Sequence, residues 1–232
     1  MNWTLMFGAA LVGYLCGSIS FARIIVRAHG HAEVKPMELT SPDGGAQMVS
    51  DAVSATAVRL QLGAKWGLLC AAGDILKAFI PTLVFRLVFP GEPYLYAAGL
   101  FAIVGHNWPV YYRFKGGRGQ SPMLGAMLAI SPIGALVCSV AGFALGYFVI
   151  RDAMTSDNLG QVLYIPWVWA VGLGPWAVLW AVLANLVFFG SYKSEIRQYV
   201  AGRRSGHLRN PDDVMQMMQM DYDWLKPRDK DR

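Results

Sequence analysis

Residues 123–150 read MLGAMLAISPIGALVCSVAGFALGYFVI, and residues 162–190 read VLYIPWVWAVGLGPWAVLWAVLANLVFFG. Neither stretch contains Asp, Glu, Lys or Arg, and each exceeds the roughly 20 residues that a helix needs to cross a bilayer. Ser131-Pro132 interrupts the first stretch, and GLGP at residues 172–175 interrupts the second. Because Gly and Pro break helices, each stretch can form one long tilted helix or two shorter helices joined by a turn.

The rest of the chain supports the same membrane interpretation. Of its 232 residues, 55% are hydrophobic and 15% are charged, whereas roughly 25% are charged in ordinary soluble domains. The mean hydropathy is +0.37, and three further apolar spans are expected over residues 3–22, 66–89 and 94–112. These features predict an all-α, polytopic transmembrane helix bundle, with seven helices if both long stretches are broken and five if neither is.

The basic residues lie on one side of these spans, which predicts the orientation of the chain. They gather in the loops at residues 23–65 and 113–121 and in the tail that begins at Lys193. By the positive-inside rule, the N-terminus is expected outside and the C-terminus in the cytoplasm; splitting both long stretches also places Arg151 inside, which favours seven helices. We therefore expect a multi-pass protein of the cell membrane, with residues 1–190 forming the bundle and its cytoplasmic loops. Residues 191–232 are expected to form a basic cytoplasmic tail.

A basic, glycine-rich loop follows the uncharged span at residues 94–112. Residues 105–119 read GHNWPVYYRFKGGRG. His106 and Asn107 are costly at the end of an apolar span unless they have partners, so they are expected to face the interior or an aqueous cavity. The loop can bind phosphate through its backbone amides and two cations. Alternatively, its charges can set the membrane topology and contact lipid head groups. The spacing of these residues allows both interpretations.

Asp74 and Lys77 are the other unusual pair, because they lie three residues apart on one helical face within the expected span at residues 66–89. The sequence favours a structural ion pair that joins two helices, with Lys77 snorkelling, over a direct catalytic role. His29 and His31 lack further ligands, so no metal site and no cofactor are expected.

The sequence at residues 105–110 and 114–119 resembles the second motif of the bacterial integral-membrane acyl-phosphate:glycerol-3-phosphate acyltransferases, which make lysophosphatidic acid. Arg118 stands where a Lys is usual. GSISF at residues 17–21, the Asp74-x-x-Lys77 pattern and the order of the apolar runs add to the resemblance. The resemblance implies a seven-helix fold with an active site at the cytoplasmic face.

Two other motifs of that family are eroded in this chain. The first motif falls on VSDAVSATA at residues 49–57, where both asparagines are replaced, by Ala52 and Ala57, and Asp51 adds a negative charge. The third motif falls on EIRQYVAGRR at residues 195–204, where Glu195 replaces the Asn and Arg204 replaces the Glu.

The resemblance implies acyl transfer from an acyl phosphate to glycerol 3-phosphate, or a related phosphorylated acceptor, in membrane phospholipid synthesis. The acyl phosphate supplies its own leaving group, so the site has to hold two anions and orient a hydroxyl. His106 is the expected catalytic residue. The expected substrate-binding residues are Ser50, Thr56, Asn107, Lys115, Gly116, Gly117, Arg118 and Gly119. The expected partners are membrane lipids and these two substrates, without nucleic acid, and the tail could hold a protein partner.

Two alternatives belong to other functional classes. A non-catalytic, acyltransferase-like membrane subunit or lipid-binding scaffold is favoured by the lost asparagines, whereas the nearly complete second motif favours an enzyme. A small transporter is disfavoured, because Asp74, Lys77 and Arg86 are too few intramembrane charges for an ion path.

Overall fold

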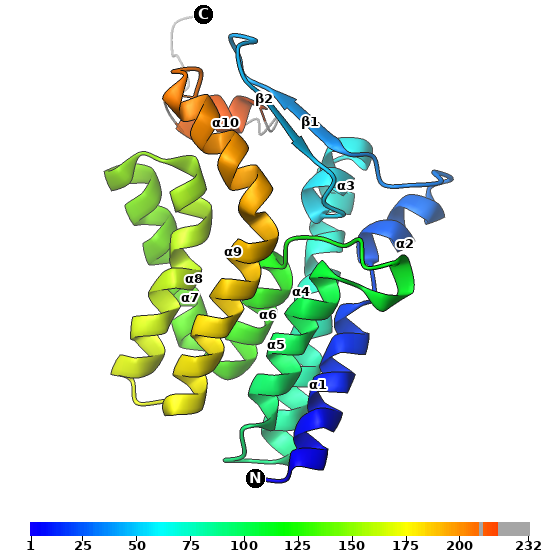
Figure 1. The fold of residues 1–232 in the computed structure, drawn as a ribbon, viewed down its shortest axis with the longest axis vertical. Helices are drawn as coiled ribbons and strands as arrows, with labels where there is room; N and C mark the ends of the chain where they lie inside the picture. The colour runs from blue at the N-terminus through cyan, green and yellow to red at the C-terminus, as the bar shows by residue number, and fades with distance from the viewer. Residues whose placement is uncertain (209–210, 218–232) are drawn as a thin grey trace, which may run out of the picture.

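The computed structural model describes residues 1–208 and 211–217, which form a helical bundle (Figure 1). Within these residues, seven helices have eleven residues or more: α1 (Trp3–Gly17), α4 (Ala64–Val88), α5 (Tyr94–Asn107), α6 (Gln120–Ile130), α7 (Pro132–Ala144), α8 (Ala153–Ala170) and α9 (Pro175–Arg204). Four segments are long and apolar enough to span a membrane by themselves: Trp3–Ala28, Ala64–Val88, Pro132–Ile150 and Pro175–Arg204. The predicted helical, polytopic membrane fold is confirmed, whereas the number of crossings and the side of each terminus stay predictions.

Both long apolar stretches are broken at the expected positions. Ser131 has an extended backbone and caps α7, accepting a hydrogen bond from the Gly134 amide at 3.3 Å, and Pro132 occupies the first turn of that helix. Gly172 and Gly174 adopt φ values of +69° and +89° between α8 and α9, a conformation that costs glycine little. A π-helical segment, η2 (Leu145–Ile150), extends α7.

Two expected spans are shorter than predicted. The span expected over residues 94–112 ends as α5 at Asn107, because Pro109 disfavours a helical conformation at Trp108 and removes a backbone donor. A short 3₁₀ turn, η1 (Val110–Tyr112), follows. The span expected over residues 3–22 ends as α1 at Gly17, and the Ser20 hydroxyl then caps α2 (Phe21–Ala28).

The loop expected over residues 23–65 contains a β-hairpin followed by a helix. Strands β1 (Met37–Thr40) and β2 (Gln47–Ser50) pair in antiparallel register with Met37 opposite Ser50. Helix α3 (Ala55–Leu62) follows the hairpin. The hairpin, α2 and α3 lie at the end of the bundle opposite the N-terminus (Figure 1).

Side-chain contacts attach the hairpin to the last helix. The Gln198 amide accepts from the Val49 N–H at 2.7 Å and donates to the Val49 carbonyl at 2.9 Å. At the hairpin turn, the Asp43 carboxylate accepts from the Ser41 hydroxyl, pairs with His207 at 2.8 Å and accepts from a backbone amide. These contacts hold the pKa of Asp43 well below its usual range. They fix the end of β2 close to α9.

The predicted boundary between bundle and tail falls inside a continuous element. Helix α9 runs from Pro175 to Arg204, so residue 190 marks no break in the backbone. A short helix, α10 (Pro211–Met217), follows, and residues 209–210 and 218–232 of the expected tail lie outside the described residues. The division into bundle and tail stays a prediction.

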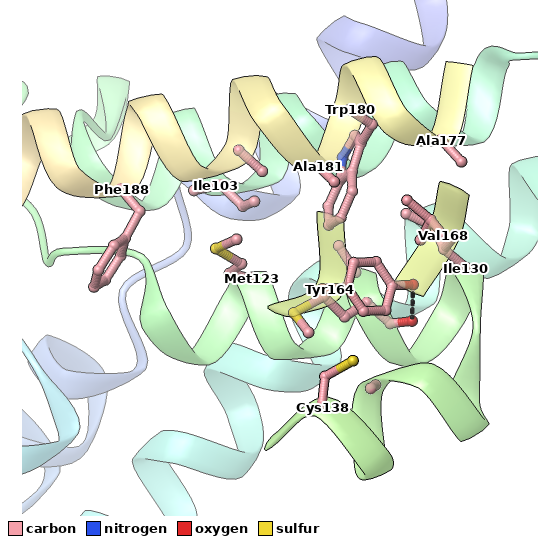
Figure 2. Close-up of a cluster of buried hydrophobic side chains, with 14 of the residues drawn as sticks. Ile103, Met123, Ile130, Cys138, Tyr164, Val168, Ala177, Trp180, Ala181 and Phe188 are labelled. Carbon is pink, nitrogen blue, oxygen red and sulfur yellow. Dashed lines mark hydrogen bonds between the residues drawn. The ribbon is translucent and has the colours of Figure 1, made fainter. Parts of the chain in front are cut away.

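The main hydrophobic cluster lies between α5, α6, α7, α8 and α9 (Figure 2). Tyr164 and Trp180 meet edge to face with their ring centroids 6.1 Å apart. The Tyr164 hydroxyl donates to the Met127 carbonyl at 3.1 Å, so this polar group has a partner within the apolar interior. By contrast, α4 exposes leucines and valines along one face, such as Leu68 at 72% and Leu87 at 69%, as expected of a helix in contact with lipid.

Small residues allow α1 and α5 to approach closely. A Cβ atom at Gly13 would collide with the Ala98 backbone, and one at Gly17 would collide with the Ala102 backbone. This arrangement resembles the small-residue contacts by which membrane helices pack.

Gly17→Leu is expected to lower the stability of the bundle by about 1–3 kcal/mol, the usual cost of overpacking. The thermal unfolding midpoint in detergent measures the effect. Gly8→Leu is a matched control on the same helix, because a Cβ at Gly8 meets nothing within 4 Å. Equal destabilisation by both substitutions would contradict close packing of α1 on α5 as the cause.

Candidate functional site

A cavity of about 280 Å³ lies at the end of the bundle that carries the hairpin. Its walls come from both hairpin strands, the segment before α3, the end of α5, the basic glycine-rich loop, α8 and α9. Five residues predicted to form the site line it: Ser50, Thr56, His106, Arg118 and Gly119. The structure therefore brings residues of the first and second motifs to one cavity.

Two hydrogen bonds hold the glycine-rich loop in place. The Val53 amide donates to the Gly116 carbonyl at 3.1 Å, which joins the first-motif segment to the loop. The Ser191 hydroxyl of α9 donates to the Arg118 carbonyl at 3.0 Å. The loop is thus fixed between segments that are distant in sequence.

Asp74 and His106, which line the cavity, form a buried cluster with Lys77. Lys77 Nζ lies 2.6 Å from Asp74 Oδ1, 2.8 Å from His106 Nδ1 and 2.7 Å from the Ile19 carbonyl oxygen. The contacts with His106 and Ile19 are hydrogen bonds, and the contact with Asp74 is an ion pair. The side chain of Lys77 is only 3% exposed, so the expected snorkelling is wrong. The predicted ion pair is present and includes His106 as a third member.

The contact with Lys77 limits what His106 can do. A lysine ammonium only donates hydrogen bonds, so Nδ1 must accept and the proton of the neutral ring is assigned to Nε2. Nε2 faces Gly117, where a Cβ atom would overlap the ring. In this arrangement His106 has no free lone pair with which to take a proton, and its contacts suit a residue that orients the loop.

Arg118 is held between two carboxylates. Its Nε and Nη2 atoms lie 2.7 Å and 2.6 Å from Glu195 Oε1, and Nη2 lies 2.8 Å from Asp51 Oδ1. The Ser50 hydroxyl donates to the same Glu195 oxygen at 2.6 Å. Burial disfavours the charge of Arg118, but the hydrogen bonds and charges of Glu195 and Asp51 outweigh this cost and raise the pKa of the guanidinium.

The lining of the cavity is acidic. Among its residues in the described part of the chain, Arg118 is the one Lys or Arg, whereas Asp74, Asp157 and Glu195 are carboxylates. Lys77 compensates Asp74, but Arg118 faces two carboxylates and their cluster keeps a formal charge of −1.

Other predicted site residues lie outside the cavity lining. Lys115 is exposed, and its carbonyl accepts from Arg23 at 2.8 Å. The Gly117 amide donates to the His106 carbonyl at 3.1 Å and is not free for a phosphate. Asn107 is buried beside Gly119, and within residues 1–208 and 211–217 its side-chain amide has no hydrogen-bond partner. Binding of substrate by Lys115, Asn107, Gly116 or Gly117 stays a prediction.

Sequence reasoning missed Glu195 and Asp157 as site residues. Glu195 stood at the Asn of the third motif and was counted only as a loss. Asp157 is a single acidic residue close to the start of the apolar run that becomes α8, and this isolated charge was the available signal. The described residues contain no group of three or more His, Cys, Asp or Glu that could hold a metal.

Comparison with known proteins places this chain in a family. The family profile described as Glycerol-3-phosphate acyltransferase matches residues 7–202. The glycerol-3-phosphate acyltransferase of Neisseria meningitidis serogroup C (strain 053442) is 32% identical over 85% of this chain and 94% of its own. That of Methylorubrum extorquens (strain PA1) is 33% identical over 87% of this chain and 92% of its own.

The fold agrees with solved structures of the same kind. The crystal structure of PlsY (YgiH), an integral membrane glycerol 3-phosphate acyltransferase, in its glycerol 3-phosphate form has a TM-score of 0.72 and 28% identity. The match covers 85% of this chain and 93% of that one. Its lysophosphatidic acid form has a TM-score of 0.70 with the same coverage.

The resemblance inferred from the second motif thus extends over nearly the whole bundle. Sequence, fold and the meeting of both motifs at one cavity agree on a multi-pass membrane protein. The chain belongs to the glycerol-3-phosphate acyltransferase family.

Proposed function

We propose that this protein transfers an acyl group from an acyl phosphate to glycerol 3-phosphate, forming lysophosphatidic acid for phospholipid synthesis. The observation that carries the proposal is the cavity in which Ser50 and Thr56 face His106, Arg118 and Gly119. Holding two substrates in reacting geometry supplies much of the acceleration that such a transfer needs, because the acyl phosphate is already activated.

The cavity lies beside the basic loops, so the positive-inside rule puts the reaction at the cytoplasmic face with the N-terminus outside. Exposed Lys115 is suited to attract an anionic substrate towards this end of the bundle. Arg118, whose charge is already shared with two carboxylates, is suited to orient groups inside the cavity. A protein partner at the C-terminal tail is a further proposal, for residues of which 209–210 and 218–232 lie outside the described part of the chain.

The purified full-length protein is expected to form lysophosphatidic acid and release inorganic phosphate when given palmitoyl phosphate and glycerol 3-phosphate. Product formation should require both substrates and saturate with each. The control is protein inactivated by heat, which corrects for spontaneous hydrolysis of the acyl phosphate. Absence of transfer from acyl phosphates of several chain lengths would contradict the proposed activity.

One observation favours a second candidate, a non-catalytic scaffold. Asp51 and Glu195 both pair with Arg118, the single Lys or Arg that lines the cavity in the described chain. Positions 52 and 57 hold alanine instead of asparagine. A scaffold would bind anionic vesicles without turning over an acyl phosphate. Turnover that saturates with glycerol 3-phosphate excludes it.

A further inference from the structure

One oxygen of the Glu195 carboxylate is buried without a partner. Oε1 accepts two hydrogen bonds, from Arg118 Nε and the Ser50 hydroxyl, and also pairs with Arg118 Nη2 at 2.6 Å. Oε2 has no hydrogen-bond donor anywhere in residues 1–208 and 211–217, although Glu195 is only 5% exposed. A buried, unsatisfied carboxylate oxygen is costly, and this one belongs to a residue that lines the cavity. A ligand that donates a hydrogen bond to Oε2 would remove this cost.

The other groups of the cavity that could accept a proton are engaged or, in the case of Asp157, less firmly held. His106 Nδ1 accepts from Lys77, and Asp74 pairs with the same ammonium. Asp157 is exposed on α8 and lacks the anchoring that Glu195 has. Glu195 is held by Arg118 and Ser50 with one oxygen free, which fixes its position before a substrate binds.

The charge of this cluster selects the part of the acceptor that can bind to it. Asp51, Glu195 and Arg118 together carry a formal charge of −1, so a phosphate dianion placed here would be repelled. A hydroxyl is neutral and donates the hydrogen bond that Oε2 lacks. An acceptor that places its hydroxyl towards Glu195 and its phosphate away from the cluster avoids this repulsion.

We propose that Glu195 binds the attacking hydroxyl of the acceptor and takes its proton, an inference that rests on the proposed acyl transfer. The hydroxyl oxygen forms a bond to the acyl carbonyl carbon while its proton moves to Glu195 Oε2. The bond between that carbon and the bridging phosphate oxygen breaks, and its electron pair leaves with the phosphate. The proton then passes from Glu195 to the departing phosphate, which restores the carboxylate.

The test compares Glu195→Gln with Asp51→Asn in the purified full-length protein, using palmitoyl phosphate and glycerol 3-phosphate. Each substitution removes one negative charge next to Arg118 and keeps the side-chain size. Loss of a general base typically lowers turnover by about 10²-fold or more, so Glu195→Gln should lower kcat by about 10²-fold, with KM changed by less than about fivefold. Asp51 has an 85% exposed side chain, and its replacement should lower kcat by no more than about fivefold.

The pH dependence of kcat adds a second readout. Turnover that uses a carboxylate base falls on the acidic side, and this fall should be absent from the residual activity of Glu195→Gln. The other titratable groups that line or flank the cavity are Asp51, Asp74, His106, Arg118, Asp157 and Tyr192. The Asp51→Asn variant should keep the fall.

Each outcome is decisive. A Glu195→Gln variant that folds and turns over within about threefold of the wild type overturns the inference and leaves the proposed function intact. Equal losses in both variants overturn it too, since loss of charge at Arg118 would then suffice. If Glu195→Gln does not fold, an active Glu195→Ala variant takes its place. A pH profile of kcat that still falls on the acidic side then overturns the inference, and a profile without this fall supports the inference. A wild type without acyl transfer overturns the proposed function and this inference together.

Discussion

A Lys77→Met variant is expected to lose about 3–5 kcal/mol of stability, the usual cost of removing one partner of a buried ion pair. The substitution leaves Asp74 charged and only 3% exposed, with its ammonium partner gone. His106 and the Ile19 carbonyl lose their donor at the same time. A lower thermal unfolding midpoint in detergent, or loss of the folded species in size-exclusion chromatography, measures the effect.

The double variant Asp74→Asn with Lys77→Met is the control. It removes both charges, so it should recover at least half of the lost stability, because no unpaired buried charge remains. If the double variant is as unstable as the single one, the ion pair does not account for the stability of this region. Activity can stay low in the double variant, because His106 still lacks its donor.

His106→Ala is expected to lower kcat by about 10²-fold or more. The ring joins Lys77 to the glycine-rich loop through Nδ1 and through its packing against Gly117. Without the ring, the loop that carries Arg118 can shift, and a misplacement of about 1 Å can cost 10²-fold in rate. The measurement is steady-state formation of lysophosphatidic acid, with the thermal unfolding midpoint to show that the variant folds.

His31→Ala serves as the matched control, since His31 is an exposed histidine outside the site and its loss should leave turnover within about twofold of the wild type. A folded His106→Ala variant with unchanged kcat would remove His106 from the site. The catalytic role predicted for His106 would then be assigned to the neighbouring carboxylates.

The cavity has a consequence for how far this chain can diverge from its relatives. Where the first and third motifs lose their asparagines, Asp51 and Glu195 both gather on Arg118. Buried charges must be compensated, so substitutions at Arg118 and Glu195, whose side chains are 22% and 7% exposed, are expected to depend on one another. Asp51 and Glu195 belong to two motifs that are separate in sequence, but in the structure both contact Arg118.

The sequence by itself determined the membrane class, the five apolar stretches and the two breaks that divide the longest of them. Those features are local, because hydrophobic length and the backbone limits of Gly and Pro act within a few residues. The same reasoning identified the basic glycine-rich loop and the Asp74–Lys77 pair, which lie three residues apart on one helix. The span predicted over residues 94–112 was too long, but Pro109 is a local signal of where its helix ends.

Only the tertiary structure decided which of these polar groups meet. His106 reaches Lys77 across 29 residues of sequence, Arg118 reaches Glu195 across 77, and Ser50 reaches Glu195 across 145. No periodicity encodes such contacts, because they depend on how α4, α5 and α9 pack and on where the hairpin docks. The sequence therefore located the chemistry in the glycine-rich loop, whereas packing decided that its arginine faces two carboxylates and that one buried oxygen of Glu195 has no hydrogen-bond partner among the described residues.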